Sequence, residues 1–302
     1  MTGLIEEERV RPWATVLRVP TADGVLYFKE PTAPVAHEAR LIEILARRRS
    51  ELVTEVLFAD AEGRMLMRSG GEPLDGILDR DPDVRYWEEA LPLYAELQVE
   101  AMADAEQLVA AGAFDRRSAA LPSLYRALIA EPAAGQTAEE YERLQALLPE
   151  VDRVAAELAG GPLPETINND DLTFGSIFLR DGAYRFLDWG DACVSHPFMT
   201  MTVTQRVIEI RHRLRLGSAE IARIRDAYLE PFTRFAPRSE LEAIVEPARR
   251  IGQISRVALR AANMDWEDDP EELVWSFRLL LDPEAWRRWT EVEQPPRQGP
   301  VS

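Results

Sequence analysis

Residues 166–192 read TINNDDLTFGSIFLRDGAYRFLDWGDA, and this stretch decides the fold. A polar loop comes first, and two short apolar runs at 176–179 and 184–187, split by an Asp-Gly turn signal, predict a β-hairpin. Asp171 and Asp188 stand at the two ends of this hairpin. Because a hairpin brings its ends together, we expect both carboxylates to lie within reach of one metal ion.

Two further acids, Asp170 and Asp191, crowd the same loop ends. Neighbouring carboxylates disfavour one another's ionisation unless a metal or a basic group neutralises them. The cluster therefore favours a cation site, and the alternative is a solvated acidic loop that holds no metal.

Upstream of the hairpin, the chain is rich in predicted strands. Two pairs of apolar or β-branched runs are each split by turn residues, and a helical pattern lies between the pairs. The strands cover 13–19, 25–29, 53–60 and 64–69, and the helix covers 36–49. A Gly-Gly connector near 68–72 follows.

From residue 83 onward, predicted helices dominate. Apolar residues recur at three- and four-residue spacing over 86–110, 118–130, 138–159, 198–216, 218–235, 238–263 and 270–281. We therefore predict an α+β fold of two lobes. These are a β-rich, nucleotide-binding lobe at 1–70 and a helical lobe at 71–292 that carries the hairpin, before a disordered tail at 293–302. A cleft between such lobes is a default ligand site.

The composition limits the classes of partner that the protein can bind. A net charge of −18 disfavours nucleic acid and anionic membranes, because both are bound by basic residues. No run approaches the roughly eighteen apolar residues that a membrane span needs. Cys193 is the only cysteine, which excludes an internal disulfide and a cysteine zinc cluster. We expect a cytoplasmic monomer or weak dimer whose partner is a small molecule.

Lys29 is the only lysine among 35 Lys and Arg residues. Under a strong bias toward arginine, a surviving lysine is a candidate for a position that needs a compact ammonium on a thin stem. Phosphate binding is one such need, and chance survival is the alternative.

Two motifs resemble the catalytic and metal-binding segments of aminoglycoside phosphotransferases and choline kinase-like enzymes. The motifs are Asp171-Leu172-Thr173-Phe174-Gly175-Ser176 and Phe186-Leu187-Asp188-Trp189-Gly190-Asp191. In that family the corresponding motifs are usually His-Gly-Asp-Leu-His-x-Gly-Asn and Ile-Asp-Phe/Trp-Gly. The second motif is followed shortly by a proline, as it is here by Pro197. The resemblance implies a protein-kinase-like fold and a kinase that uses ATP or GTP with Mg²⁺.

The resemblance also implies roles for single residues. Asp171 would accept or orient the hydroxyl of the acceptor, and Asp188 would bind magnesium. Lys29, fixed by Glu38, would hold the α- and β-phosphates.

The nucleotide's other contacts follow from the same resemblance. The segment 11–15, which ends at Thr15, resembles the family's nucleotide-covering turn. The backbone from Met67 to Ser69 would meet adenine.

Five positions depart from the family pattern. They are Asn169 in place of His, Asp170 in place of Gly, Thr173 in place of a second His, Ser176 in place of the Asn that binds a second magnesium, and Thr200 in place of an acid that supports the catalytic loop. A hydroxyl can ligate magnesium, so Ser176 stays a predicted ligand. We expect Asn169 and Thr200 to compensate each other. The alternatives are a pseudokinase that binds nucleotide in a regulatory role and a scaffold that binds none.

The acceptor is the least readable part. Asp191 and the acidic loop Asp265-Trp266-Glu267-Asp268 are candidates for binding a cationic acceptor, such as an aminoglycoside or an amino alcohol, through charge and cation–π contacts. A solvated loop that begins the next helix is the alternative interpretation.

Overall fold

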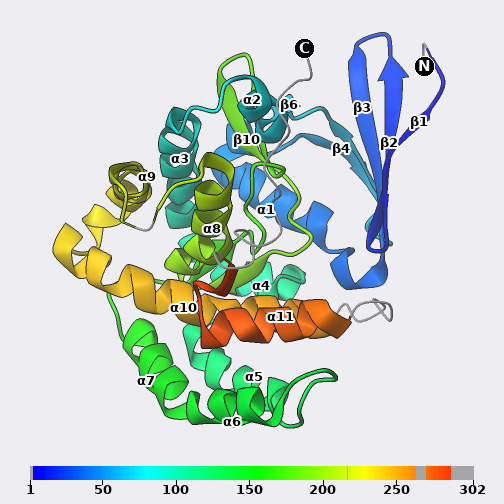
Figure 1. Cartoon of the computed structure of the whole chain (residues 1–302). Helices are drawn as coiled ribbons and strands as arrows, with labels where there is room; N and C mark the ends of the chain where they lie inside the picture. The colour runs from blue at the N-terminus through cyan, green and yellow to red at the C-terminus, as the bar shows by residue number, and fades with distance from the viewer. Residues whose placement is uncertain (1–2, 216, 263–269, 287–302) are drawn as a thin grey trace, which may run out of the picture.

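The computed structural model describes residues 3–215, 217–262 and 270–286. They form a β-rich N-terminal lobe and a larger helical lobe, which confirms the predicted α+β fold (Figure 1). Within these residues, no helix combines the length and the apolar character that crossing a bilayer requires.

The N-terminal sheet is antiparallel, and its strand order is β1-β2-β3-β5-β4. Its strands are β1 (Glu6–Arg11), β2 (Ala14–Thr21), β3 (Gly24–Pro31), β4 (Val56–Ala59) and β5 (Met65–Arg68). The four predicted strands are all present. Strand β1 was not predicted, because its sequence EEERVR has no buried position and only one apolar residue. Pro12 and Trp13 connect β1 to β2 in a two-residue turn.

Helix α1 (Glu38–Arg49) joins the sheet to the helical lobe. Its apolar face buries Leu41 and Leu45 completely, and the helix contacts α3 (Arg85–Ala101) in the other lobe. Each such side chain contributes roughly 1.5–3 kcal/mol on burial. One continuous hydrophobic core therefore includes residues of both lobes.

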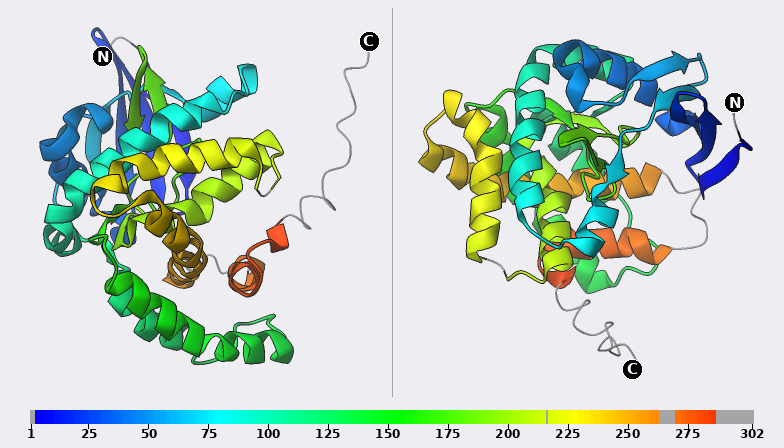
Figure 2. Two further views of the ribbon diagram at one scale, coloured as in Figure 1. Left: turned by 90° about the vertical axis from the view of Figure 1, so that its left-hand side faces the viewer. Right: turned by 90° about the horizontal axis from the view of Figure 1, so that it is seen from above.

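The helical lobe surrounds α10 (Arg238–Ala262). Its other α-helices are α2 (Leu74–Arg80), α4 (Ala105–Ala111), α5 (Leu121–Leu128), α6 (Ala138–Ala146), α7 (Leu148–Ala159), α8 (Met201–His212), α9 (Ala219–Leu229) and α11 (Pro270–Leu281). Helices α5 to α7 lie at the end of the molecule farthest from the N-terminal sheet (Figures 1 and 2).

Two predicted helices are each split in two, and α2 was not predicted. The helix expected over 86–110 is interrupted by a 3₁₀ turn at Met102–Asp104. The helix expected over 138–159 breaks at Leu147, between α6 and α7. Pro149, near the start of α7, has no N–H and clashes with a preceding helical turn, so it suits a helix start and not a helix interior.

The predicted hairpin is present as β9 (Ile177–Arg180) and β10 (Ala183–Phe186). Strand β6 (Glu72–Pro73), which follows the Gly-Gly connector, pairs with β9. Gly71 has φ +116°, and a Cβ atom there would lie 2.4 Å from the Leu179 carbonyl oxygen. Only glycine fits this close approach between the connector and the hairpin.

A second small sheet fixes the two loops that flank the hairpin. Its order is β7-β11-β8, from β7 (Phe114–Asp115), β11 (Cys193–Ser195) and β8 (Thr166–Asn168). The polar loop leaves β8, the loop after the hairpin enters β11, and these two strands pair antiparallel. The two loops are therefore held side by side.

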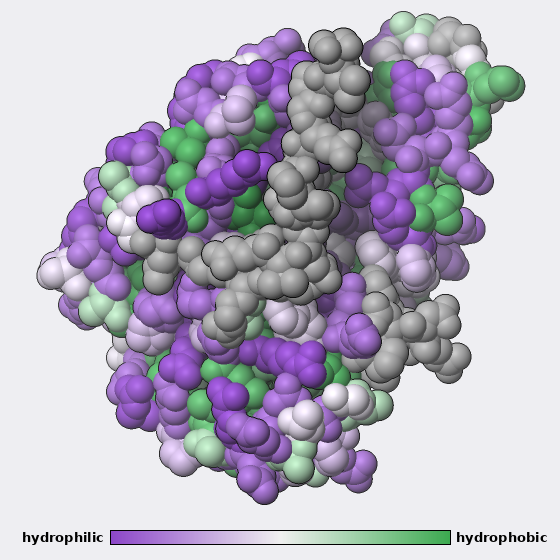
Figure 3. All heavy atoms as spheres, viewed as in Figure 1, coloured by the Kyte–Doolittle hydropathy of each residue, from purple (hydrophilic) through white to green (hydrophobic). Residues whose placement is uncertain are grey.

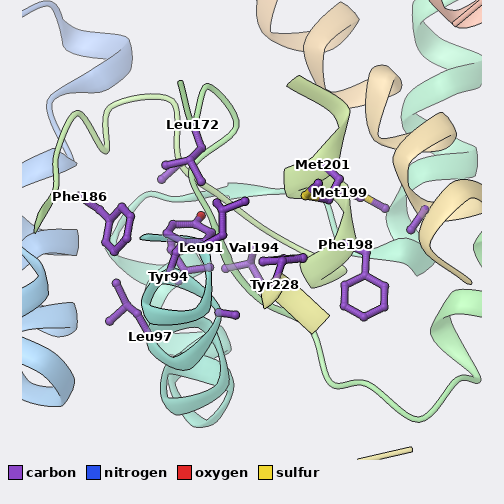
Figure 4. Packing of buried hydrophobic residues seen from close by; sticks show 14 of the residues in the cluster. Leu91, Tyr94, Leu97, Leu172, Phe186, Val194, Phe198, Met199, Met201 and Tyr228 are labelled. Atoms are coloured by element: carbon purple, nitrogen blue, oxygen red, sulfur yellow. The ribbon is translucent and has the colours of Figure 1, made fainter. Parts of the chain in front are cut away.

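The core beneath these loops is aromatic. Tyr94 of α3 stacks on Trp189 and packs edge to face against Phe186. Leu172 of the polar loop lies nearby in the same cluster (Figure 4). Packing at this density transmits displacements, so the loop backbones have little freedom to move.

Gly252 lets α10 approach the start of α8 closely. A Cβ atom at this position would lie 2.3 Å from Thr202 Oγ1 and 3.1 Å from Met199 Cβ. We expect Gly252→Ala to lower the free energy of unfolding by about 1–3 kcal/mol, because the added methyl overpacks this contact. Chemical denaturation measures this change in the free energy of unfolding.

Gly76→Ala is the matched control for Gly252→Ala, since Gly76 also lies inside a helix. The nearest neighbour of an added Cβ there is the mobile carboxylate of Glu72, at 3.1 Å. Helix propensity should make this change neutral or stabilising, by up to about 1 kcal/mol. Equal losses in both variants would contradict the close-packing argument.

Candidate functional site

Lys29 is clamped between two carboxylates from different parts of the fold. Its Nζ lies 2.6 Å from Glu38 Oε2 at the start of α1 and 2.7 Å from Asp188 Oδ1 in the loop after β10. The side chains of Lys29 and Glu38 are 9% and 3% exposed, whereas that of Asp188 is 55% exposed. The cluster therefore presents one accessible carboxylate and a buried ammonium.

Lys29 and Asp188 each favour the charged form of the other. Burial alone would lower the pKa of Lys29, but Asp188 and Glu38 together raise it above its ordinary value. Lys29 in turn lowers the pKa of Asp188. Burial raises the pKa of Glu38 although Lys29 opposes this, and the Trp189 N–H donates to Glu38 Oε1 at 3.0 Å. The site thus holds a protonated lysine beside an ionised Asp188.

The backbone at Asp188 has φ 63°, in the left-handed region that few non-glycine residues occupy. Strain of this kind persists only where the surroundings fix it, and it gathers at functional sites. Here the Asp188 carbonyl accepts a hydrogen bond from Asn169 Nδ2 at 3.1 Å.

Asn169 braces the two loops against each other. Its Nδ2 donates to the carbonyls of Leu187 and Asp188, each at 3.1 Å, and its Oδ1 accepts from the Asp171 N–H at 3.1 Å. Its own N–H donates to the Tyr94 hydroxyl at 2.7 Å. The Asn169 side chain therefore connects the polar loop that follows β8 to the loop of Asp188.

We expected Asn169 and Thr200 to compensate each other, but in the structure these two side chains do not bond to each other. Thr200 Oγ1 donates to Asn168 Oδ1 at 2.7 Å and accepts from Gln98 Nε2 at 3.1 Å. Thr200 still supports the strand that leads into the catalytic loop, but through the neighbouring asparagine. The two adjacent Asn side chains point to different partners, which the sequence could not distinguish.

Asp171 and Asp170 have opposite environments. The Asp171 side chain is 48% exposed, and its Oδ1 lies 3.1 Å from Nη2 of Arg256 on α10. Asp170 is buried, accepts from Ser255 Oγ at 3.1 Å, and its carbonyl accepts from Arg256 Nη1 at 3.0 Å. Burial raises the pKa of Asp170. Arg256 is thus the basic group that neutralises the acidic loop.

Ser176 is turned into its own loop. Its hydroxyl accepts from the Thr173 N–H at 2.9 Å and lies 3.0 Å from the Thr173 carbonyl, to which it donates. The residue is buried. These bonds hold the loop closed, and the metal-binding role assigned to Ser176 stays a prediction.

Asp191 is partly buried among charged groups. Burial raises its pKa to about 7, with Arg256 opposing and Asp188, Asp171 and Asp170 adding to the rise. It therefore belongs to the same electrostatic cluster as the catalytic loop. The other predicted acceptor residues, Asp265, Trp266, Glu267 and Asp268, lie outside the described residues.

A cleft opens between the lobes at Lys29, and its volume of about 1200 Å³ includes space open to solvent (Figure 3). Met67 lines it as predicted, and Ala14 and Val16 line it where Thr15 was expected. Side chains alternate along β2, which places Thr15 on the other face of the strand. Ser69 borders a neighbouring surface pocket instead.

The cleft contains residues that sequence reasoning missed. Tyr27 lies two positions before Lys29 on β3 and therefore on the same face, which is the signal that could have found it. Arg9 and Arg11 of β1 line the cleft on its open side, and Phe178 and Leu187 line it from the helical lobe.

The fold and the Lys29 cluster define a bilobal kinase-like scaffold. No protein-family model matches the sequence. No curated protein matches it either.

Solved structures that share this fold include kinases of small molecules. A Mesorhizobium loti choline/ethanolamine kinase family protein has TM-score 0.60 and 18% identity, over 97% of this chain and 90% of that one. A Plasmodium vivax ethanolamine kinase has TM-score 0.66 and 11% identity, over 94% and 84%. An aminoglycoside 2′-phosphotransferase-IIIa bound to GDP has TM-score 0.61 and 15% identity, over 94% and 93%. At these identities the likeness establishes the fold.

Replacing Asn169 should loosen the brace between the loops. We expect Asn169→Ala to lower the free energy of unfolding by about 1–3 kcal/mol, because two buried carbonyls lose their donor. Denaturant titration measures this. The control is Gln145→Ala, which removes an exposed amide from α6 and should change little. Equal stability of the Asn169 variant and wild type would contradict the bracing role.

Proposed function

We propose that this protein is an ATP-dependent phosphotransferase that moves the γ-phosphate to a hydroxyl group of a small molecule. The observation that carries the proposal is the Lys29 clamp, which faces the interlobe cleft and holds a protonated lysine beside the accessible carboxylate of Asp188. Phosphoryl transfer is catalysed mainly by positioning and charge, and this cluster supplies both.

The cleft suits a nucleotide. The aromatic ring of Tyr27 and the apolar side chains of Val16, Phe178 and Leu187 supply surfaces for a purine base. Lys29 supplies the positive charge for the phosphates, and Arg9 lies on the same cleft wall.

The donor chemistry at Asp188 fits magnesium. Its carboxylate is a hard oxygen ligand, and magnesium is usually held by one or two carboxylates together with nucleotide phosphates. No group of three metal-binding side chains occurs in the described part of the chain. When bound, the ion would neutralise charge on the phosphates.

Asp171 is the residue that we propose acts on the hydroxyl group of the acceptor. In the transfer, the acceptor's hydroxyl oxygen bonds to the γ-phosphorus, the bond from that phosphorus to the oxygen of ADP breaks, and the hydroxyl proton is released. The half-exposed carboxylate of Asp171 can orient the hydroxyl and accept that proton. Asn169 holds the loop of Asp171 in register with the loop of Asp188.

A nucleotide-binding pseudokinase is the second candidate, and one observation favours it. Arg256 pairs with the same Asp171 carboxylate that a transfer reaction would use. In a pseudokinase this ion pair would be permanent. In an active kinase the acceptor would share or displace it. The kinases of ethanolamine and of aminoglycosides that share this fold support the active alternative.

Nucleotide binding should depend on Lys29. We expect wild type to bind ATP in the presence of magnesium, and Lys29→Ala to bind on the order of tenfold to hundredfold more weakly, because charged hydrogen bonds to the phosphates are lost. Calorimetric titration with and without magnesium measures both. Arg153→Ala, which breaks an exposed ion pair on α7, is the control. Absence of binding by wild type would refute the proposed function.

Replacing Asp171 should reduce catalysis and leave nucleotide binding largely intact. We expect Asp171→Asn to reduce phosphate transfer by about 10²–10⁴-fold while ATP affinity changes little. Asp188→Asn should also remove the magnesium dependence of ATP binding. The control is Asp181→Asn in the exposed hairpin turn, where the side chain is 91% exposed. Nucleotide binding with no transfer to any acceptor in a broad hydroxyl-compound screen would favour the pseudokinase.

A further inference from the structure

One face of α10 carries a row of cationic and amide side chains. Arg249, Gln253, Arg256 and Arg260 are spaced four, three and four residues apart, which places them on the same side of the helix. Arg256 contacts Asp171, so the row passes beside the proposed catalytic carboxylate. Arg206 of α8 lies close enough to this row for the charges of Arg256, Arg249 and Arg260 to act on it.

All but one of these arginines have acidic partners. Arg256 pairs with Asp171 at 3.1 Å, Arg249 with Glu246 at 2.7 Å, and Arg260 with Glu272 at 2.9 Å. Arg206 differs from them. Across residues 3–215, 217–262 and 270–286, it has neither a hydrogen bond nor an ion pair.

Leaving Arg206 unpaired is costly because its side chain is partly buried. Burial, reinforced by the charge of Arg256, lowers the pKa of Arg206 to about 10. A buried charge without a partner destabilises the fold, and such charges are typically kept where a ligand completes them. The overall charge of −18 would repel an anion, so any anion site on this chain needs local basic side chains.

Arg206 also borders a small, largely basic pocket between α8, α10 and α11. Arg249, Arg250 and Gln253 of α10 and Thr202 of α8 line the same pocket. Arg250 is paired with Glu150 at 2.8 Å, and Thr202 Oγ1 donates to the Arg249 carbonyl at 2.8 Å. Arg206 is therefore the arginine of this pocket whose donors are uncommitted within the described residues.

We propose that the acceptor carries an anionic group, a carboxylate or a phosphate monoester, which pairs with Arg206 while its hydroxyl group lies at Asp171. This inference rests on the proposed phosphotransfer and names the class of acceptor for that site. The transfer itself is unchanged: the hydroxyl oxygen bonds to the γ-phosphorus, ADP leaves, and Asp171 takes the proton. Arg256, which pairs with Asp171 at 3.1 Å, neutralises this carboxylate until the acceptor binds.

The sequence favoured a cationic acceptor because acidic residues are abundant near the catalytic loop. The structure places arginines on the side of that loop that faces α10, and Asp170 is buried beneath it. A cation at this position would meet Arg206 and Arg256 at close range, and like charges would repel it.

Inorganic sulfate is the probe for the anion site. Sulfate is titrated calorimetrically into wild type, Arg206→Gln and the control Arg153→Gln, each saturated with MgADP so that the nucleotide cleft is filled. We expect Arg206→Gln to bind sulfate about tenfold more weakly or worse, and the control to match wild type. The titration is repeated in the Lys29→Ala background, where the cleft contributes little. Equal sulfate binding by wild type and Arg206→Gln, or none by wild type, would overturn the proposal.

Stability is an independent readout of the same residue. Because Arg206→Gln removes an unpaired buried charge, the variant should unfold at an equal or higher denaturant concentration than wild type, which also shows that it folds. Sulfate should raise the midpoint of wild type more than that of the variant. A large loss of stability in Arg206→Gln would mean that the arginine is structural, and would overturn the proposal.

Turnover then distinguishes the sources of the anionic group. ADP release is measured with four acceptors that carry hydroxyl groups on the same three-carbon frame. They are glycerol, glycerate, glycerol 3-phosphate and 3-amino-1,2-propanediol. Turnover that is at least tenfold higher with either acid than with the amine supports the proposal, and the preferred acid identifies carboxylate or phosphate. Higher turnover with the amine would overturn it. Failure of wild type to bind MgATP would refute the phosphotransferase and leave the sulfate result as a separate test of the anion site.

Discussion

The ion pairs of Lys29 are the contact on which the arrangement of the site depends. One ammonium connects β3, the start of α1 and the loop after β10, which are elements of both lobes. Two of the three side chains are buried, so the pairs are only weakly screened by water and salt. Breaking one partner would leave an uncompensated buried charge, a change that costs several kcal/mol. The position of Asp188 relative to the cleft is therefore fixed by the same contact that fixes the lysine.

The strain at Asp188 is tolerated because other contacts fix it. Its left-handed backbone is held by Asn169 from below and by Lys29 at the carboxylate. Tyr94 anchors Asn169 to the aromatic core. The chain of contacts thus runs from packed hydrophobic side chains to the charged cluster, and the site inherits the rigidity of the core.

Much of the fold could be predicted from local pattern, and the parts that could not depend on distant contacts. Alternation and turn residues located the strands, and the lone lysine and two aspartates located the charged cluster. Strand β1 was missed because an exposed edge strand has no apolar pattern. The partner of Thr200 was predicted wrongly because Asn168 and Asn169 are adjacent in sequence, and only the strand pairing of β8 with β11 decides which one faces it.

Arg206 and Arg256 show a further limit of composition. The chain is strongly acidic overall, and its average charge suggested a cationic ligand. A ligand, however, responds to the charges within about a Debye length, which is roughly 8 Å in physiological salt. At short range, Arg256 of α10 pairs with Asp171 at 3.1 Å, and the charge of Asp171 also acts on Arg206 of α8. Because these arginines and Asp171 lie far apart in sequence, their proximity follows from the fold, and the charges around a bound ligand are a property of the folded chain.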